Sequence, residues 1–146
     1  MFSGSIEVRL DAKGRLFIPA SYRRILAEMK AQKLFLRSEP GIDCLTVFPQ
    51  EVWMERLNQL ASRLDDWNSD DLSLLLQLNS EAEEVQPDSQ GRLLLSKKHL
   101  QAIKSTGQEL LIVGLMNRFT IWDKKVYEGF RLSSQELSQA IKQRLN

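Results

Sequence analysis

Apolar and polar positions follow a simple order at the start of the chain. Apolar and charged residues alternate over residues 6–10, which is the period of a half-buried strand. The polar stretch Asp11–Gly14 predicts a tight turn, and the apolar run 16–18 predicts a returning strand, so the two strands should form a β-hairpin. The elements expected next are a helix from Ala20 with the apolar face Tyr22, Ile25, Leu26 and Met29, and strands over residues 33–37 and 44–48.

The second part of the chain repeats this order. A strand over residues 84–86 leads into a polar turn, an apolar run follows at 93–95, and a helix starts after it. Ser96 stands where Pro19 stood, and both favour a helix start, serine as an N-cap and proline through its fixed φ. Further strands are predicted over residues 110–114 and 119–122. An order that persists through strand, helix, strand, strand and helix predicts two similar halves.

The two turns carry one short motif, in which aspartate is followed by two residues, a glycine and an arginine. The first copy is Asp11-Ala12-Lys13-Gly14-Arg15, and the second is Asp88-Ser89-Gln90-Gly91-Arg92. Aspartate caps its own turn through its side chain, and glycine adopts a left-handed conformation without steric cost. Each half is therefore predicted to present a tight turn tipped with a basic residue.

Helical sequence separates the halves. A first helix has the apolar stripe Val52, Trp53, Leu57, Leu60, Ala61 and Leu64. A second helix, capped by Ser69, has the apolar residues Leu72, Leu74, Leu75, Leu76 and Leu78 on several sides, so we expect it to be buried, partly against another subunit. The predicted segments are a first repeat over 1–53, a helical spacer over 54–80, a second repeat over 81–130, and a polar amphipathic helix or tail over 131–146.

The composition indicates a folded domain and limits the cellular compartments in which we expect it. The chain has 146 residues, of which 42% are hydrophobic, enough for a core shared by two halves. Its single cysteine, Cys44, excludes an internal disulfide and a Cys/His metal cluster, and is expected to be a small buried residue. No segment approaches the roughly 18 apolar residues of a membrane span, so we expect a cytoplasmic protein without a membrane partner.

Charge is unevenly distributed, although the formal net charge is only +1. Residues 1–37 hold eight Lys/Arg and three Asp/Glu, and residues 87–146 hold ten and five. Residues 38–86 hold two Lys/Arg and eleven Asp/Glu. Contact with phosphates needs local positive charge, so the two basic segments that carry the turns favour a nucleic-acid partner. Such swings also occur on ordinary solvated surfaces, and charge alone leaves both interpretations open.

Catalytic chemistry finds little support. His99 is the only histidine and lies in a basic stretch at a predicted helix start, where a surface position is expected. Asp11 and Asp88 are explained by turn formation, no glycine-rich phosphate loop is present, and no serine or cysteine has a histidine partner that the sequence places nearby. We therefore expect no enzyme, no cofactor, no metal and no small-molecule substrate.

DNA binding fits the turns better. Lys13 and Arg15 flank Gly14 at the first tip, with Arg9 on the polar face of the incoming strand, and Gly91 and Arg92 form the second tip. A two-stranded β-ribbon fits the DNA major groove, where arginine can give two parallel hydrogen bonds to guanine. Lysine can meet guanine or phosphate. Because many hairpin turns use aspartate and glycine, the motif alone does not decide for DNA.

The sequence resembles the MraZ family from Met1 to about Phe130. The resemblance lies in Met1-Phe2-Ser3-Gly4, both D-x-x-G-R turns, Asp43-x-Leu45-x-x-Phe48-Pro49, Val113-Gly114 and Phe119-x-x-Trp122-Asp123. It implies a bacterial transcriptional regulator that binds double-stranded DNA upstream of a division and cell-wall gene cluster. It further implies an α+β fold similar to AbrB and MazE, a double-split, swapped-hairpin β-barrel of two tandem repeats with helices packed outside, and assembly into a ring-shaped homo-oligomer.

The resemblance also implies which residues meet DNA. Carried onto this chain, they are Lys13, Gly14 and Arg15 in the first turn, and Gly91 and Arg92 in the second. With Arg9 added from the strand pattern, these six residues are the predicted DNA-binding set of a nucleoid-associated regulator, whether repressor or activator. Gln90 replaces the basic residue found at Lys13, so we expect the first turn to carry most of the contact.

The chain departs from the family pattern in its central helical segment, and two other functions stay open. Leu72 and Ser73 stand where many relatives are expected to have an arginine pair, and the spacer is strongly acidic. The acidic spacer, the apolar helix and the near-neutral total charge are the case for an oligomeric interaction or scaffold protein without specific DNA binding. The other rival is an antitoxin-like AbrB relative that grips a protein toxin through a disordered tail.

Overall fold

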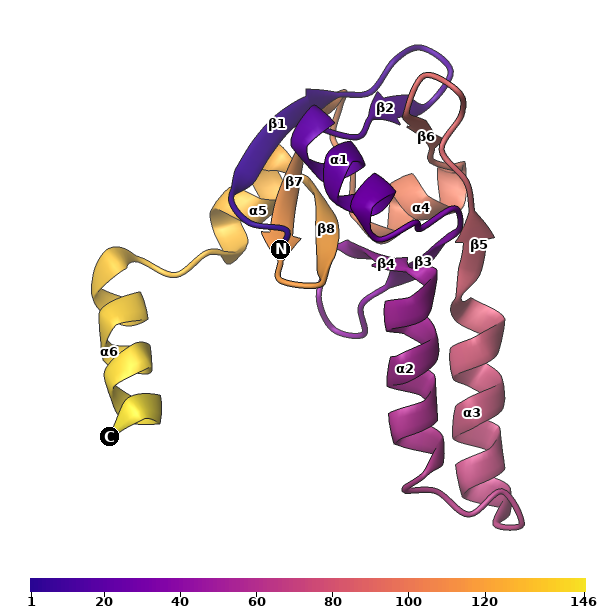
Figure 1. The fold of residues 1–146 in the computed structure, drawn as a ribbon. Helices are drawn as coiled ribbons and strands as arrows, with labels where there is room; N and C mark the ends of the chain where they lie inside the picture. The colour runs from indigo at the N-terminus through magenta and orange to yellow at the C-terminus, as the bar shows by residue number, and fades with distance from the viewer.

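The computed structural model describes residues 1–146 and contains eight strands and six helices. The first half contains β1 (Ser5–Arg9), β2 (Arg15–Phe17), α1 (Ala20–Glu28), β3 (Leu34–Ser38), β4 (Leu45–Pro49) and α2 (Gln50–Ala61). After α3 (Ser69–Glu81), the second half contains β5 (Glu83–Val85), β6 (Arg92–Leu94), α4 (Lys97–Ala102), β7 (Glu109–Leu115), β8 (Arg118–Asp123) and α5 (Lys124–Phe130), and α6 (Ser134–Leu145) ends the chain. The order strand, strand, helix, strand, strand, helix therefore occurs twice (Figure 1).

All strands pair antiparallel, in two sheets. Six strands form a sheet in the order β1-β7-β8-β4-β3-β5, and β2 and β6 form a separate two-stranded ribbon. The predicted α+β class is confirmed. The large sheet ends at β1 and β5, which do not pair with each other, so no closed barrel is found and the predicted double-split barrel is not confirmed.

The expected local hairpin is wrong, because β1 and β2 do not pair with each other. β1 pairs with β7 of the second half, with Ser5 opposite Val113, and β2 pairs with β6, with Leu16 opposite Leu93. In return, β5 of the second half pairs with β3 of the first. Alternation of apolar and polar residues marks a strand but does not name its partner, so the exchange between halves could not be read from the pattern.

The core is built from both halves at once. A cluster of 17 buried apolar residues includes Leu16 and Leu93 from the ribbon and Ile112 from the large sheet. The N-terminal residue Phe2 belongs to it, and its ring lies 5.1 Å from that of Tyr22 between centroids. Two halves that share a core and exchange strands stabilise each other, so neither buries its apolar face alone.

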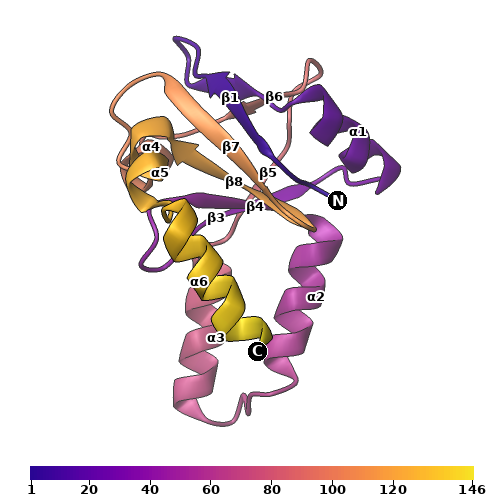
Figure 2. The same cartoon turned by 90° about the vertical axis from the view of Figure 1, so that its left-hand side faces the viewer.

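Two helical parts project from the core, and the only buried residue in them is Trp53 of α2. α2 and α3 extend from the sheet as a long helical hairpin, whose two helices lie side by side in Figure 1 and diverge in Figure 2. α6 stands apart from both in Figure 1. No residue of α3 or α6 is buried. The expected burial of the leucine-rich helix is therefore wrong within one chain, where Leu72, Leu74 and Leu76 are exposed. Its N-cap is Asn68 rather than Ser69, because the Asn68 side chain accepts hydrogen bonds from the N–H groups of Asp70 and Asp71.

His99 is buried, contrary to the surface position expected for it, with only 8% of the residue exposed. Its Nδ1 accepts a hydrogen bond from the N–H of Ser96, and its Nε2 lies 2.8 Å from a carboxylate oxygen of Glu83. Ser96 in turn accepts from the N–H of His99, which completes a capping box and confirms Ser96 as the N-cap of α4. The sequence placed His99 at a basic helix start, whereas strand exchange brings Glu83 of β5 against it.

Cys44 is buried as expected. Its residue is 2% exposed, and burial raises the pKa of the thiol to about 12, with the charges of Glu39 and Asp43 adding to the effect. The thiol therefore stays protonated and is a packing group rather than a nucleophile. No helix in the structure combines the length and the apolar character that crossing a membrane would require.

Asp123, at the end of β8, connects Thr106 of the α4–β7 loop to the start of α5 through its side chain. Its buried carboxylate accepts hydrogen bonds from the N–H and hydroxyl of Thr106 and from the N–H of Val126, which caps α5. Burial acts to raise the pKa of Asp123, but these hydrogen bonds outweigh it and hold the pKa below the ordinary value. The charged form is thus the one the fold stabilises.

Replacing Asp123 with alanine is expected to lower the free energy of unfolding at pH 7 by about 2 kcal/mol, since a cap and two further hydrogen bonds are lost. Because the native pKa is depressed, the stabilisation is present above the ordinary aspartate pKa and is lost as pH falls through the native value. Urea unfolding at pH 7 and in acid should show the difference from the wild type shrinking. Ser133→Ala, which removes the cap of the unburied helix α6, is the control and should leave global unfolding nearly unchanged.

Candidate nucleic-acid interface

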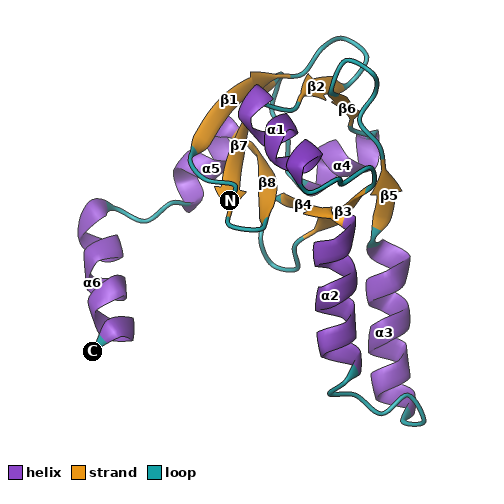
Figure 3. Cartoon of the chain, viewed as in Figure 1, coloured by secondary structure: helices purple, strands orange, loops and turns teal.

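The two D-x-x-G-R turns lie side by side at one end of the molecule. Both the β1–β2 and the β5–β6 connections are loops at the same end in two perpendicular views (Figures 2 and 3). The β2–β6 ribbon joins them, and two further hydrogen bonds lock the pair, from Ile18 N–H to the Gly91 carbonyl (3.0 Å) and from Leu95 N–H to the Gly14 carbonyl (2.8 Å). Each glycine therefore accepts a hydrogen bond from the other half.

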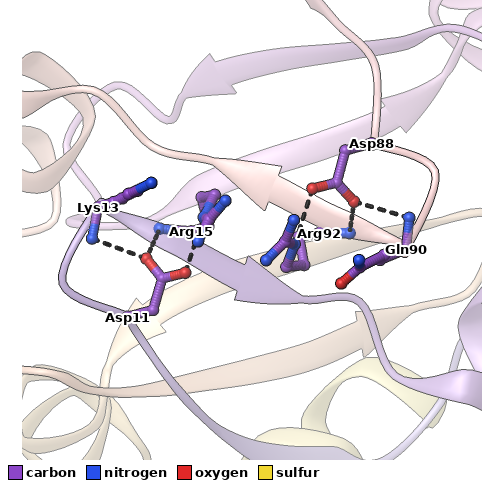
Figure 4. Close-up of polar contacts among 6 residues, drawn as sticks. All are labelled: Asp11, Lys13, Arg15, Asp88, Gln90 and Arg92. Atoms are coloured by element: carbon purple, nitrogen blue, oxygen red, sulfur yellow. Dashed lines mark hydrogen bonds and ion pairs between the residues drawn. The ribbon is translucent and has the colours of Figure 1, made fainter.

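Within the first turn, one carboxylate organises the chain. Oδ1 of Asp11 accepts hydrogen bonds from the N–H groups of Lys13 and Arg15, both 2.9 Å, and Oδ2 accepts from Nε of Arg15 at 2.7 Å (Figure 4). Gly14 has φ of +83°, a left-handed conformation that favours glycine. The predicted role of Asp11 in the turn is confirmed.

The second turn has the same hydrogen-bond pattern as the first, with Ser89 and Gln90 in the two middle positions. Asp88 accepts from the N–H groups of Gln90 and Arg92 at 3.0 and 2.9 Å, and from Nε of Arg92 at 2.7 Å. Gly91 has φ of +82°. Figure 4 shows the arginines on the inner side of the pair, with Lys13 and Gln90 at its outer ends. The two turns thus form a matched pair that offers its guanidinium groups together.

The aspartates fix the arginines electrostatically. The pKa of Asp11 is lowered, most strongly by the hydrogen bond from the Arg15 N–H and further by the Arg15 side chain, and the pKa of Asp88 is lowered by Arg92 in the same way. Each carboxylate engages only Nε of its arginine, so both terminal nitrogens of each guanidinium are free to donate. Such an oriented pair of donors suits the edge of guanine or a phosphate.

The outer face of the ribbon combines these charges with apolar groups. Arg15 lies opposite Leu94, and Phe17 lies opposite Arg92, while Leu16 between them faces the core. Phe17 and Leu94 are 54% and 60% exposed, and the Arg92 guanidinium lies 6.0 Å from the Phe17 ring centroid, within cation–π range. The face therefore presents two donors and two apolar side chains.

Arg23 is a basic residue at the second turn that the local sequence pattern does not indicate. A Cβ placed on Gly91 would lie 2.5 Å from Cδ and 3.0 Å from Nη1 of Arg23, so this α1 side chain crosses the glycine backbone. Arg23 is exposed and forms no ion pair. A cation from α1 of the first half thus lies beside the second turn, where Gln90 stands in the position of Lys13.

Five of the six residues predicted to bind DNA lie in the paired turns, and the sixth, Arg9, lies outside them. Lys13, Gly14, Arg15, Gly91 and Arg92 all belong to the paired turns. Arg9 ends β1, where its guanidinium donates to Oε1 of Gln108 (2.8 Å) and borders a polar hollow lined also by Lys124 and Lys125. Arg9 is therefore held toward the α5 side of the sheet rather than on the ribbon face.

Other sites offer less. No cluster of three or more metal-ligating side chains is present. A partly apolar groove of about 390 Å³ lies beside α5 and is lined by residues that include Trp122, Tyr127 and Arg118. Among its lining residues, the Thr46 hydroxyl donates a hydrogen bond to Oε1 of Glu39 (2.8 Å), and none is a histidine.

Known proteins resemble this chain over nearly its whole length. The family model described as "MraZ protein, putative antitoxin-like" matches residues 1–71 and 78–145. The chain belongs to the MraZ family. Proteins named Transcriptional regulator MraZ from Bacteroides thetaiotaomicron and Nitrosospira multiformis are 41% and 34% identical to it, each over 145 residues, covering 99% of this chain and 92% and 97% of theirs. One from Bacteroides fragilis is 36% identical over 97% of this chain and 89% of its own.

Membership of the MraZ family confirms the resemblance seen in the sequence. The relatives carry the name of transcriptional regulators, which are not enzymes. The family match spans both halves with their D-x-x-G-R turns, so the matched pair lies within the part of the chain that defines the family.

Proposed function

We propose that this chain is a sequence-specific DNA-binding transcriptional regulator of the MraZ type, acting in the cytoplasm at the nucleoid on the promoter of a division and cell-wall gene cluster. The observation that carries the proposal is the matched pair of turns, whose arginines are oriented by Asp11 and Asp88 on one ribbon face. The aspartates engage Nε of each guanidinium, and the terminal nitrogens, which form no hydrogen bond inside the chain, suit the acceptors on guanine.

In this mechanism the ribbon enters the major groove. Arg15 and Arg92 donate end-on to guanine O6 and N7, because their Nε groups are already engaged by the aspartates. Phe17 and Leu94 supply apolar contact of the kind that a thymine methyl accepts. Preorganisation by the aspartates lowers the entropy lost when the arginines bind.

Lys13 and Arg23 flank the reading face and are assigned to phosphates. Both are exposed cations without an acidic partner. Gly14 and Gly91 let the backbone approach the duplex closely. Arg9 has a lesser share, since its guanidinium is turned toward Gln108.

Assembly would convert weak contacts into useful affinity. We assign the chain to a ring-shaped homo-oligomer, in which neighbouring subunits engage repeated short sites on one duplex at high effective concentration. The exchange of β1 to β7 and of β5 to β3 supports the finer assignment of a swapped-hairpin, double-split barrel.

The function is tested by binding to the DNA upstream of the chain's own gene across a range of salt concentrations. We expect affinity to fall steeply with salt, with a slope near −0.9 for each phosphate contacted, and a scrambled duplex to bind much more weakly at every salt. Equal and weak binding of both duplexes would contradict the proposal and favour the interaction or scaffold protein. Binding only to a protein toxin would favour the antitoxin, although residues 134–145 form a capped helix rather than a disordered tail.

Arg23→Ala provides a narrower test of the second turn. It should weaken binding to all duplexes by a similar factor, about tenfold or less, and reduce the salt slope by about one, because a phosphate contact carries no sequence information. Arg63→Ala, at the far end of the α2–α3 hairpin, removes the same charge and should change neither quantity. A change of base preference in Arg23→Ala would mean that it reads bases instead.

A further inference from the structure

Two helical parts of the chain expose apolar stripes that nothing in the chain covers. On α3, Leu72 and Leu76 lie one turn apart on the same flank, and Leu76 is 62% exposed. On α6, Leu137, Ile141 and Leu145 form a stripe at four-residue spacing, with Ile141 48% exposed. Apolar stripes on helices of this kind are normally packed against another element.

The two parts carry opposite charge. The α2–α3 hairpin, residues 50–81, holds seven Asp/Glu and two Lys/Arg, whereas residues 131–146 hold three Lys/Arg and one Asp/Glu. None of these side chains forms an ion pair within the chain. Lys142 and Arg144 beside the α6 stripe therefore complement the acidic hairpin, so each surface fits the other better than a copy of itself.

The dimensions also match. α6 has 12 residues and α3 has 13, so at 1.5 Å per residue each is about 18–20 Å long. α6 and the hairpin extend from the same side of the large sheet but stand apart (Figure 1). The linker between α5 and α6, residues 131–133, spans at most about 11 Å. Since α6 does not pack on the hairpin of its own chain, the hairpin of a neighbouring chain is the surface that we assign to it.

We propose that α6 of one chain docks along the α2–α3 hairpin of a second copy, with the stripe Leu137–Ile141–Leu145 on Leu72 and Leu76, and the basic end of α6 against the hairpin acids. The contact joins two different surfaces, so it is head-to-tail, and repetition closes a ring when the rotation permits. It rests on the ring in the proposed function and names the two surfaces that build it.

The test uses full-length protein and measures molar mass by light scattering. Ile141→Glu on α6 and Leu76→Glu on α3 should each reduce the wild-type oligomer to monomers, because each buries a charge in the apolar contact. Gln139→Glu and Gln77→Glu introduce the same charge away from the stripes and should keep the wild-type mass. Neither helix is buried in the core, so unfolding midpoints of all four variants should stay close to the wild type.

Mixing the two disruptive variants gives the decisive result. Ile141→Glu retains a working hairpin, and Leu76→Glu retains a working α6, so a one-to-one mixture should form a heterodimer through the single intact contact. A monomeric wild type, an oligomer that survives both substitutions, or a mixture that stays monomeric would overturn the proposal. DNA binding is measured separately: loss of preference for the upstream duplex by the wild type would count against the proposed function and leave the contact intact.

Discussion

Replacement of both Arg15 and Arg92 with alanine is expected to weaken binding to the upstream duplex by about a hundredfold or more. Each guanidinium is held by its aspartate with two free terminal nitrogens, and an oriented arginine–guanine pair contributes about 1–3 kcal/mol of discrimination. Two such pairs convert to roughly two orders of magnitude in affinity. Fluorescence anisotropy at a fixed salt concentration measures the change.

The same variants test how the contact is shared. The sequence predicts that Arg15→Ala alone costs more than Arg92→Ala, because the first turn also has Lys13. The structure adds Arg23 and the Phe17 ring to the second turn, which predicts more nearly equal losses. Binding of the double variant at wild-type strength, with its fold shown intact, would exclude the ribbon face as the DNA-reading surface.

Replacement of Gly114 with alanine is expected to destabilise the fold by about 3 kcal/mol or more. An added Cβ would overlap the backbone of Ser3 and lie 2.5 Å from the carbonyl carbon of Phe2, so the N-terminal segment would have to move. That movement would break the hydrogen bond from Gly114 N–H to the Gly4 carbonyl. It would also withdraw Phe2, only 1% exposed, from the core, and loss of a buried phenylalanine costs about 3–5 kcal/mol.

Urea unfolding measures this effect, and Gly107→Ala is the matched control. A Cβ at Gly107 meets no atom within 4 Å, so its free energy of unfolding should change by no more than about 0.5 kcal/mol. A Gly114→Ala protein as stable as the wild type would mean that residues 1–4 contribute little to the core, and that the packing of Phe2 on Tyr22 and Phe119 is dispensable.

Turn chemistry could be predicted from sequence because it is local. Asp11 and Gly14 lie three residues apart, and the carboxylate and the left-handed glycine form the same turn wherever the chain allows it. The same reasoning explains why Ser96 was recognised as an N-cap. The strands themselves were also predictable, since the alternation in residues 6–10 reports which side chains face the core.

Contacts between distant residues could not be predicted in this way. His99 is buried against Glu83, Arg23 crosses Gly91, and Arg9 turns to Gln108, each across a separation that local periodicity does not sample. The leucine-rich helix was expected to be buried because removing apolar side chains from water is favourable. Within a single chain no residue of α3 is buried, so its apolar side chains stay open to another partner.

By itself, therefore, the sequence determined the strands, the helices, both D-x-x-G-R turns and the family. Those features depend on side chains a few residues apart, whose hydrogen bonds and periodicity are present before any long-range contact forms. Tertiary structure alone decided that β2 pairs with β6, which places Arg15 and Arg92 on one face, and that Arg23 supplies the second turn with its charge. Pairing depends on which apolar faces meet in the shared core, and only the folded chain settles that choice.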